Sequence, residues 1–113
     1  MNKVLIQQGN DWTDGNYLIK QTSPAQPEQY DMLDKEGSIV GYFRLRHGTY
    51  TVEYPDVCGE VLVCAYPQGD GCFDCLEREY WITLGYLKII QTIGGEAISK
   101  IISDNLTRIP EIF

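Results

Sequence analysis

Apolar and polar side chains alternate along residues 30–53, and two turns that contain glycine interrupt the alternation. His47 and Gly48 fit a two-residue type I′ turn, because glycine accepts positive φ freely and histidine is enriched among the other residues found there. Such a turn sets the register of its hairpin, so Leu45 should face Tyr50 and Phe43 should face Val52. One face of the hairpin is then apolar, with the side chains of Phe43, Leu45, Tyr50, Val52 and Tyr54.

The opposite face of this hairpin is polar. It carries the side chains of Tyr42, Arg44, Arg46, Thr49, Thr51 and Glu53. Upstream, residues 34–38 resemble a three-residue hairpin loop with Gly37 in the left-handed conformation. This loop joins a strand at 29–34 to the strand that begins at Ser38, so the sequence predicts a three-stranded meander.

Further short strands are predicted at 4–7, 17–21 and 60–66. From Asp74 the pattern becomes helical: Asp74 and Glu77 form a capping box, and Gly94 with Gly95 should end the helix. Its apolar arc is wide, with one stripe of Leu76, Tyr80, Leu84 and Leu87 and further apolar positions at Ile82, Tyr86, Ile89, Ile90 and Ile93. This helix needs cover on more than one side, either from the sheet and a second helix at 96–105 or from another chain.

These elements predict an α+β domain over residues 1–113, which is one domain's worth of chain with enough apolar residues (43%) to fill a core. We expect an antiparallel meander sheet of five or six strands with one long C-terminal helix and a shorter second helix packed on one face. No segment approaches the length of a membrane span, and the N-terminus does not resemble a signal peptide. The expected location is therefore a reducing cytoplasm.

The net charge of −7 argues against a non-specific nucleic-acid binder, which needs a surplus of Lys and Arg. Most of the excess lies between residues 53 and 79, where Arg78 is the single base. The acids there are Glu53, Asp56, Glu60, Asp70, Asp74, Glu77 and Glu79. This acidic segment is either a solvated face that keeps the protein in solution or a docking surface for a basic partner.

Four cysteines, Cys58, Cys64, Cys72 and Cys75, form a C-x5-C-x7-C-x2-C array. Only Cys72 and Cys75 have the spacing of a zinc knuckle, and Cys64 is expected to be a small core residue in its strand. We therefore predict free thiols and no metal site, with a four-cysteine zinc site or a redox pair as the weaker alternative. No cofactor is expected.

No catalytic motif is present. The single histidine, His47, is expected at a hairpin tip, and the sequence has neither a nucleophile elbow nor a glycine-rich phosphate loop. Arg44 and Arg46 are predicted to project beside Tyr42 and Tyr30, where they could hold a phosphate or carboxylate or pair with Glu53 and other acids. The candidate binding residues are Tyr30, Tyr42, Arg44, Arg46, Glu53, Asp70, Glu77 and Trp81.

The favoured hypothesis is a small acidic, non-enzymatic module that binds another protein, such as an inhibitor or adaptor of the kind that phages and other mobile elements encode. It depends on the acidic segment and on the surplus apolar surface of the helices, which could also form a homodimer. The alternatives are a small-ligand or nucleotide binder that uses Arg44 and Arg46, and a cysteine-dependent zinc or redox protein.

Overall fold

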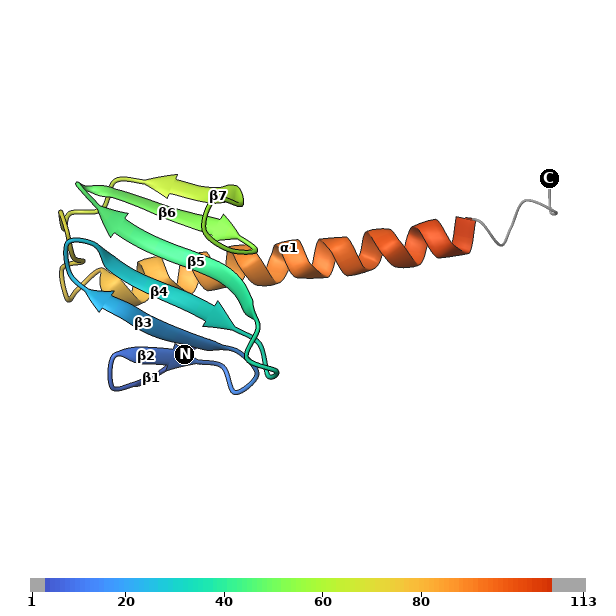
Figure 1. Cartoon of the computed structure of the whole chain (residues 1–113), viewed down its shortest axis with the longest axis horizontal. Coiled ribbons are helices and arrows are strands. Elements are labelled where there is room, and N and C mark those ends of the chain that lie inside the picture. Colours follow the sequence, from blue (N-terminus) through green and yellow to red (C-terminus); the bar gives the residue numbers. More distant parts are fainter. Residues whose placement is uncertain (1–3, 107–113) are drawn as a thin grey trace.

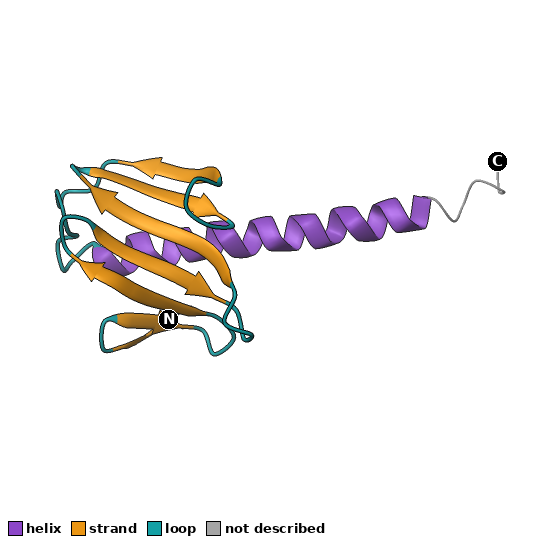
Figure 2. Cartoon of the chain, in the orientation of Figure 1, coloured by secondary structure: helices purple, strands orange, loops and turns teal. Residues whose placement is uncertain are grey.

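The computed structural model describes residues 4–106, with the side chains described as far as Ile98. One layer is a single antiparallel sheet in which seven strands follow one another in chain order, and the other layer is one helix (Figures 1 and 2). The strands are β1 (Ile6–Gln8), β2 (Asp11–Thr13), β3 (Leu18–Pro24), β4 (Glu28–Leu33), β5 (Ile39–Arg46), β6 (Thr49–Tyr54) and β7 (Glu60–Ala65), and the helix is α1 (Arg78–Leu106).

The α+β class and the meander are confirmed, whereas the predicted count of five or six strands is wrong. The strand that the sequence pattern misses is β2, which has three residues and lies between two turns. Three residues are too few to establish an alternation of apolar and polar positions. Trp12 is nevertheless buried and pairs with Ile19 of β3, so this strand belongs to the sheet.

The hairpin of β5 and β6 has the predicted register. His47 and Gly48 both have positive φ, at 53° and 75°, as a type I′ turn requires. The paired residues are Tyr42 with Glu53, Phe43 with Val52, Arg44 with Thr51, Leu45 with Tyr50, and Arg46 with Thr49. The side chains of Phe43, Leu45, Tyr50 and Val52 are fully buried, so the predicted apolar face is confirmed.

The Glu77 half of the predicted capping box forms just before α1. Residues 74–77 form a turn, and the backbone N–H of Arg78 donates to the carbonyl of Asp74 over 3.1 Å. The Glu77 carboxylate reaches back and accepts from the backbone N–H of Asp74, also over 3.1 Å. Regular helix then begins at Arg78.

The predicted end of the helix at Gly94 and Gly95 is wrong, and no separate second helix forms. Both glycines lie inside α1, which is one continuous helix of 29 residues. A glycine ends a helix when it takes a left-handed conformation, and neither of these two has a positive φ. The residues that follow, Glu96, Ala97 and Ile98, favour continuation, so the glycines only weaken the helix locally.

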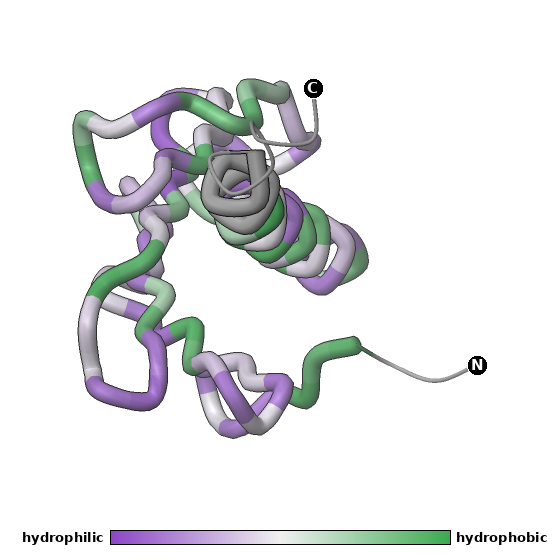
Figure 3. The backbone as a smooth tube through the Cα atoms, turned by 90° about the vertical axis from the view of Figure 1, so that its right-hand side faces the viewer, coloured by the Kyte–Doolittle hydropathy of each residue, from purple (hydrophilic) through white to green (hydrophobic). Residues whose placement is uncertain are grey.

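The core lies between the sheet and one side of α1. Ile82, Tyr86 and Ile89 of the helix are buried against the apolar face that contains Phe43 and Tyr50. Viewed along the helix, the sheet curves partly around it and the other face of the sheet has no helix on it (Figure 3). Among the described residues, no helix is long and apolar enough to cross a membrane.

Candidate functional site

The structure distributes the eight predicted binding residues over four places. Tyr42, Arg44, Arg46 and Glu53 belong to the open face of the sheet, as predicted. Glu77 and Trp81 lie at the start of α1, and Asp70 lies in the loop between β7 and the helix. Tyr30 lies on the covered face, apart from the arginines.

Tyr30 does not neighbour Arg44 and Arg46 because a β-bulge separates it from the expected register. The pairing of β4 with β5 shifts between Met32 and Leu33, so Tyr30 lies opposite Phe43. A shift of one residue moves a side chain to the other face of a sheet. Tyr30 is therefore 1% exposed and cannot stack over a ligand that Arg44 and Arg46 hold.

Tyr30 instead belongs to a buried polar network that joins the sheet to the helix. Its hydroxyl donates to the carboxylate of Glu28, which is fully buried. Glu28 also forms an ion pair with Arg78, whose Nε lies 2.9 Å from Oε2, and accepts from the backbone N–H of Phe73. Burial and the adjacent Glu28 carboxylate raise the pKa of Tyr30 well above its usual range. These contacts give Tyr30 a structural role.

On the open face, the pair of Tyr42 and Arg44 forms as predicted. The Arg44 guanidinium lies 6.0 Å from the centre of the Tyr42 ring, and the Tyr42 hydroxyl donates to Gln29. Burial and Glu53 raise the pKa of Tyr42, although Arg44 opposes the shift. Glu53 is nearly buried and accepts from the backbone N–H of Cys58, and among the described residues it forms no ion pair with either arginine.

Glu77 and Trp81 hold the loop before α1 in place. The Glu77 carboxylate accepts backbone hydrogen bonds from Gln68, Gly69 and Asp74, and a fourth from the indole of Trp81. Burial acts to raise the pKa of Glu77, but these hydrogen bonds outweigh it and lower the pKa. The hydrogen bonds that the Glu77 carboxylate accepts therefore all come from within the chain.

All four cysteines are exposed free thiols. The prediction that Cys64 is a small core residue is wrong, because Cys64 lies opposite Thr51 on the open face. Among residues 4–106, no three Cys, His, Asp or Glu side chains gather closely enough to hold a metal ion. The zinc alternative therefore gains no support from the arrangement of the thiols.

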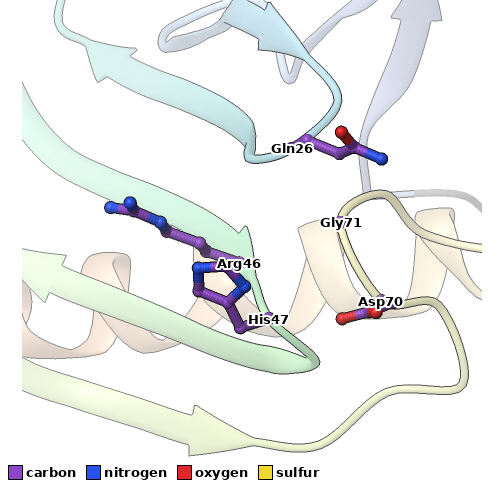
Figure 4. Close-up of a pocket in the computed structure, with 5 residues that line it drawn as sticks. All are labelled: Gln26, Arg46, His47, Asp70 and Gly71. Carbon is purple, nitrogen blue, oxygen red and sulfur yellow. The ribbon is translucent and has the colours of Figure 1, made fainter.

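Two of the predicted residues, Arg46 and Asp70, line one polar cleft at an end of the sheet (Figure 4). The cleft has a volume of about 310 Å³, and its other lining residues are Gln26, His47 and Gly71. The sequence correctly predicts His47 as a turn residue, but gives no sign that it also lines a cleft. Gln26 carries no sequence signal at all, because its position depends on a contact with Gly71 far along the chain.

A row of apolar side chains runs from the turn before α1 along the outer side of the helix. Leu76 is 96% exposed and Tyr80 is 62% exposed, and with Leu84 and Leu87 they are the predicted stripe. A shallow hollow of about 430 Å³ follows this stripe and is lined by Leu76, Glu79, Tyr80, Thr83, Leu84 and Leu87. No second helix folds back over it, so among the described residues the stripe has no cover. We refer to Leu76, Tyr80, Leu84 and Leu87 as the outer stripe.

No protein-family model matches the chain, and no curated protein or solved structure matches it significantly.

Proposed function

We propose that this protein is a non-enzymatic module, an inhibitor or adaptor, that binds another protein through the outer stripe of α1. The observation that carries the proposal is a row of four large apolar side chains that begins in the turn before α1 and continues along the helix, whose other side packs on the sheet. Leu76, Tyr80 and Leu87 are exposed, and Leu84 between them is half-buried. Contiguous apolar surface of this kind marks interaction sites in folded proteins.

The spacing of the outer stripe suits insertion into a groove. Its residues recur at intervals of four, four and three, which places Tyr80, Leu84 and Leu87 on one side of α1 and Leu76 in the turn that leads into it. Peptide and protein grooves commonly accept helices through anchors at this spacing. Tyr80 adds an aromatic anchor, and its ring is held edge-on against Trp81 with the ring centres 4.8 Å apart.

Charge favours a basic partner over a second copy of this chain. The net charge is −7, and exposed Asp74 lies two residues before Leu76, the first residue of the outer stripe. Like charges oppose self-association, whereas a partner with a basic rim around an apolar groove would be attracted. The complex should accordingly weaken as salt is added.

The test compares two double variants in affinity capture from cells that express the protein. Leu76→Ser with Tyr80→Ser removes the two most exposed anchors. Val61→Ser with Tyr66→Ser is the matched control, because it removes an aliphatic and a tyrosine side chain that are also exposed. All four substitutions lie at exposed positions, so both proteins should melt at nearly the wild-type temperature.

We expect a partner that is recovered in stoichiometric amounts by the wild type and the control and is lost with the outer-stripe variant. With purified partner, calorimetry should show affinity reduced at least about 100-fold by the outer-stripe variant, since each lost anchor typically costs 2 kcal/mol or more. Equal recovery by both variants would contradict the proposal. So would sedimentation as a monomer together with capture of the protein alone.

A further inference from the structure

The cleft at the end of the sheet is built from three turns that the backbone locks together. The loop before α1 crosses the ends of the strands, and its Gly71 carbonyl accepts from the backbone N–H of Gln26 and Glu28 over 2.7 and 2.9 Å. The neighbouring Asp70 carbonyl accepts from the backbone N–H of Gly48 over 3.0 Å. The walls are therefore preformed, which reduces the entropy lost when a ligand binds.

Three side chains of complementary chemistry border this cleft without partners. Among residues 4–106, the side chains of Arg46, His47 and Asp70 make no hydrogen bond or ion pair with one another or with other side chains. Arg78, by contrast, is bonded to Glu28, and the Asp34 carboxylate accepts two backbone hydrogen bonds. The polar side chains at the cleft are thus available to a ligand.

The groups of opposite charge lie at different ends of the cleft. Arg46 and His47 come from the hairpin of β5 and β6, and the guanidinium of Arg46 extends away from Asp70 (Figure 4). Asp70 lies on the facing loop next to Gly71, and Gln26 lies on the far side of Gly71 (Figure 4). An anion bound by Arg46 alone would be repelled by Asp70, unless the same molecule also offered hydrogen-bond donors to that carboxylate.

We propose that this cleft binds a small phosphorylated molecule that carries hydroxyl groups. Its phosphate is held by the Arg46 guanidinium and the His47 imidazole, and its hydroxyls donate to the Asp70 carboxylate. A volume of about 310 Å³ is at the lower end of small-molecule sites, which suits a ligand of the size of a sugar phosphate. Gly71 keeps this end of the cleft narrow, because a Cβ there would lie 2.6 Å from Cγ of Gln26.

The test is a titration of the whole protein followed by amide NMR, with ribose 5-phosphate, inorganic phosphate and ribose as probes. The amides of Gly48, Asp70 and Gly71 report on the cleft. We expect saturable shifts at these amides with ribose 5-phosphate and at least about tenfold weaker binding of phosphate or ribose alone.

Arg46→Gln and Asp70→Asn should each weaken the binding of ribose 5-phosphate about tenfold. Arg44→Gln is the matched control, because Arg44 lies on the same strand and the same face but contacts Tyr42; its affinity should stay within about twofold of the wild type. The inference is overturned if the shifts do not saturate, if phosphate alone binds as tightly as ribose 5-phosphate, or if Arg46→Gln binds like the wild type.

This site and the protein-binding surface can fail separately. Leu76→Ser with Tyr80→Ser should leave the titration with ribose 5-phosphate unchanged, since neither residue lines the cleft. Arg46→Gln should likewise leave capture of the protein partner unchanged.

Discussion

Asp14 joins the N-terminal strands to the helix through one carboxylate. It accepts the backbone N–H groups of Asn16 and Tyr17 over 2.7 and 2.8 Å, and the hydroxyl of Tyr86 from α1. Burial acts to raise the pKa of Asp14, but the three hydrogen bonds outweigh it and lower the pKa. The folded state therefore favours the ionised carboxylate.

The lowered pKa of Asp14 determines how its contribution to stability depends on pH. Because the pKa of Asp14 is lower in the folded than in the unfolded chain, its contribution is present above about pH 4 and is lost as the pH falls through the folded value. Asp14→Asn should lower the free energy of unfolding at pH 7 and reduce the loss of stability between pH 5 and about pH 2. Urea unfolding at several pH values measures both effects. An acid profile identical to that of the wild type would show that Asp14 does not contribute.

At the scale of the element, α1 depends on glycine where it touches the sheet. A Cβ at Gly85 would lie 2.7 Å from Cε2 of Phe43 and 2.7 Å from the hydroxyl oxygen of Tyr50. Both rings are fully buried, so they cannot move aside easily. Gly85 thus sets how closely the helix approaches β5 and β6. Gly94 has nothing within 4 Å of the same position, although it lies in the same helix.

The two glycines should respond in opposite directions to the same substitution. Gly85→Ala should destabilise the protein by about 1–2 kcal/mol, because overpacking exceeds the gain in helix propensity. Gly94→Ala should stabilise it by about 0.5–1 kcal/mol, since only the propensity changes. Urea unfolding followed by circular dichroism gives both values. Two changes of the same sign would indicate that Gly85 is not a close contact.

The sheet shows how far local sequence determines a register. The turn at His47 and Gly48 has two residues, so its chemistry alone predicts every pair between β5 and β6. The register of β4 with β5 was not predicted, because the bulge adds one residue, Val40, to β5 between the partners of Leu33 and Met32, and the loop at 34–38 gives no sign of it. That single shift placed Tyr30 in the core, on the opposite face from Arg44.

The two candidate surfaces also differ in how far local sequence predicts them. The outer stripe could be predicted, because it depends on helical spacing within one segment. The cleft could not, because its residues meet through backbone contacts between turns that are distant in the chain, such as Gln26 with Gly71. The glycine pair at 94 and 95 misled the prediction because glycine marks a helix end only where the backbone turns left-handed.

At the scale of the whole molecule, α1 extends well past the sheet (Figure 1). Ile93 is the last described side chain that packs against the buried core, and beyond it Glu96 accepts an exposed hydrogen bond from the hydroxyl of Tyr54. The radius of gyration is 16.7 Å, compared with about 13 Å for a compact domain of this length. The extension offers a partner additional helix surface that the sheet does not use.

Hydrogen exchange at backbone amides should distinguish the part of α1 that packs on the sheet from the part that extends past it. Amides between Gly94 and Ile98 should exchange hydrogen faster than those between Ile82 and Ile93, because the latter lie against the core. If the partner proposed above also covers the extension, its addition should slow exchange at 94–98. Exchange measured by mass spectrometry tests both statements. Equal rates along the helix in the free protein would show that packing does not stabilise its first half.

The strict chain order of the strands has a consequence for the route by which the protein folds. Every strand pairs with a neighbour in the chain, so each ladder closes through a short loop at a small cost in chain entropy. Such local pairing lowers the contact order and speeds folding. We therefore expect the docking of the helix to be the slow step, since its contacts with β5 bring together segments about forty residues apart, as in Phe43 and Gly85.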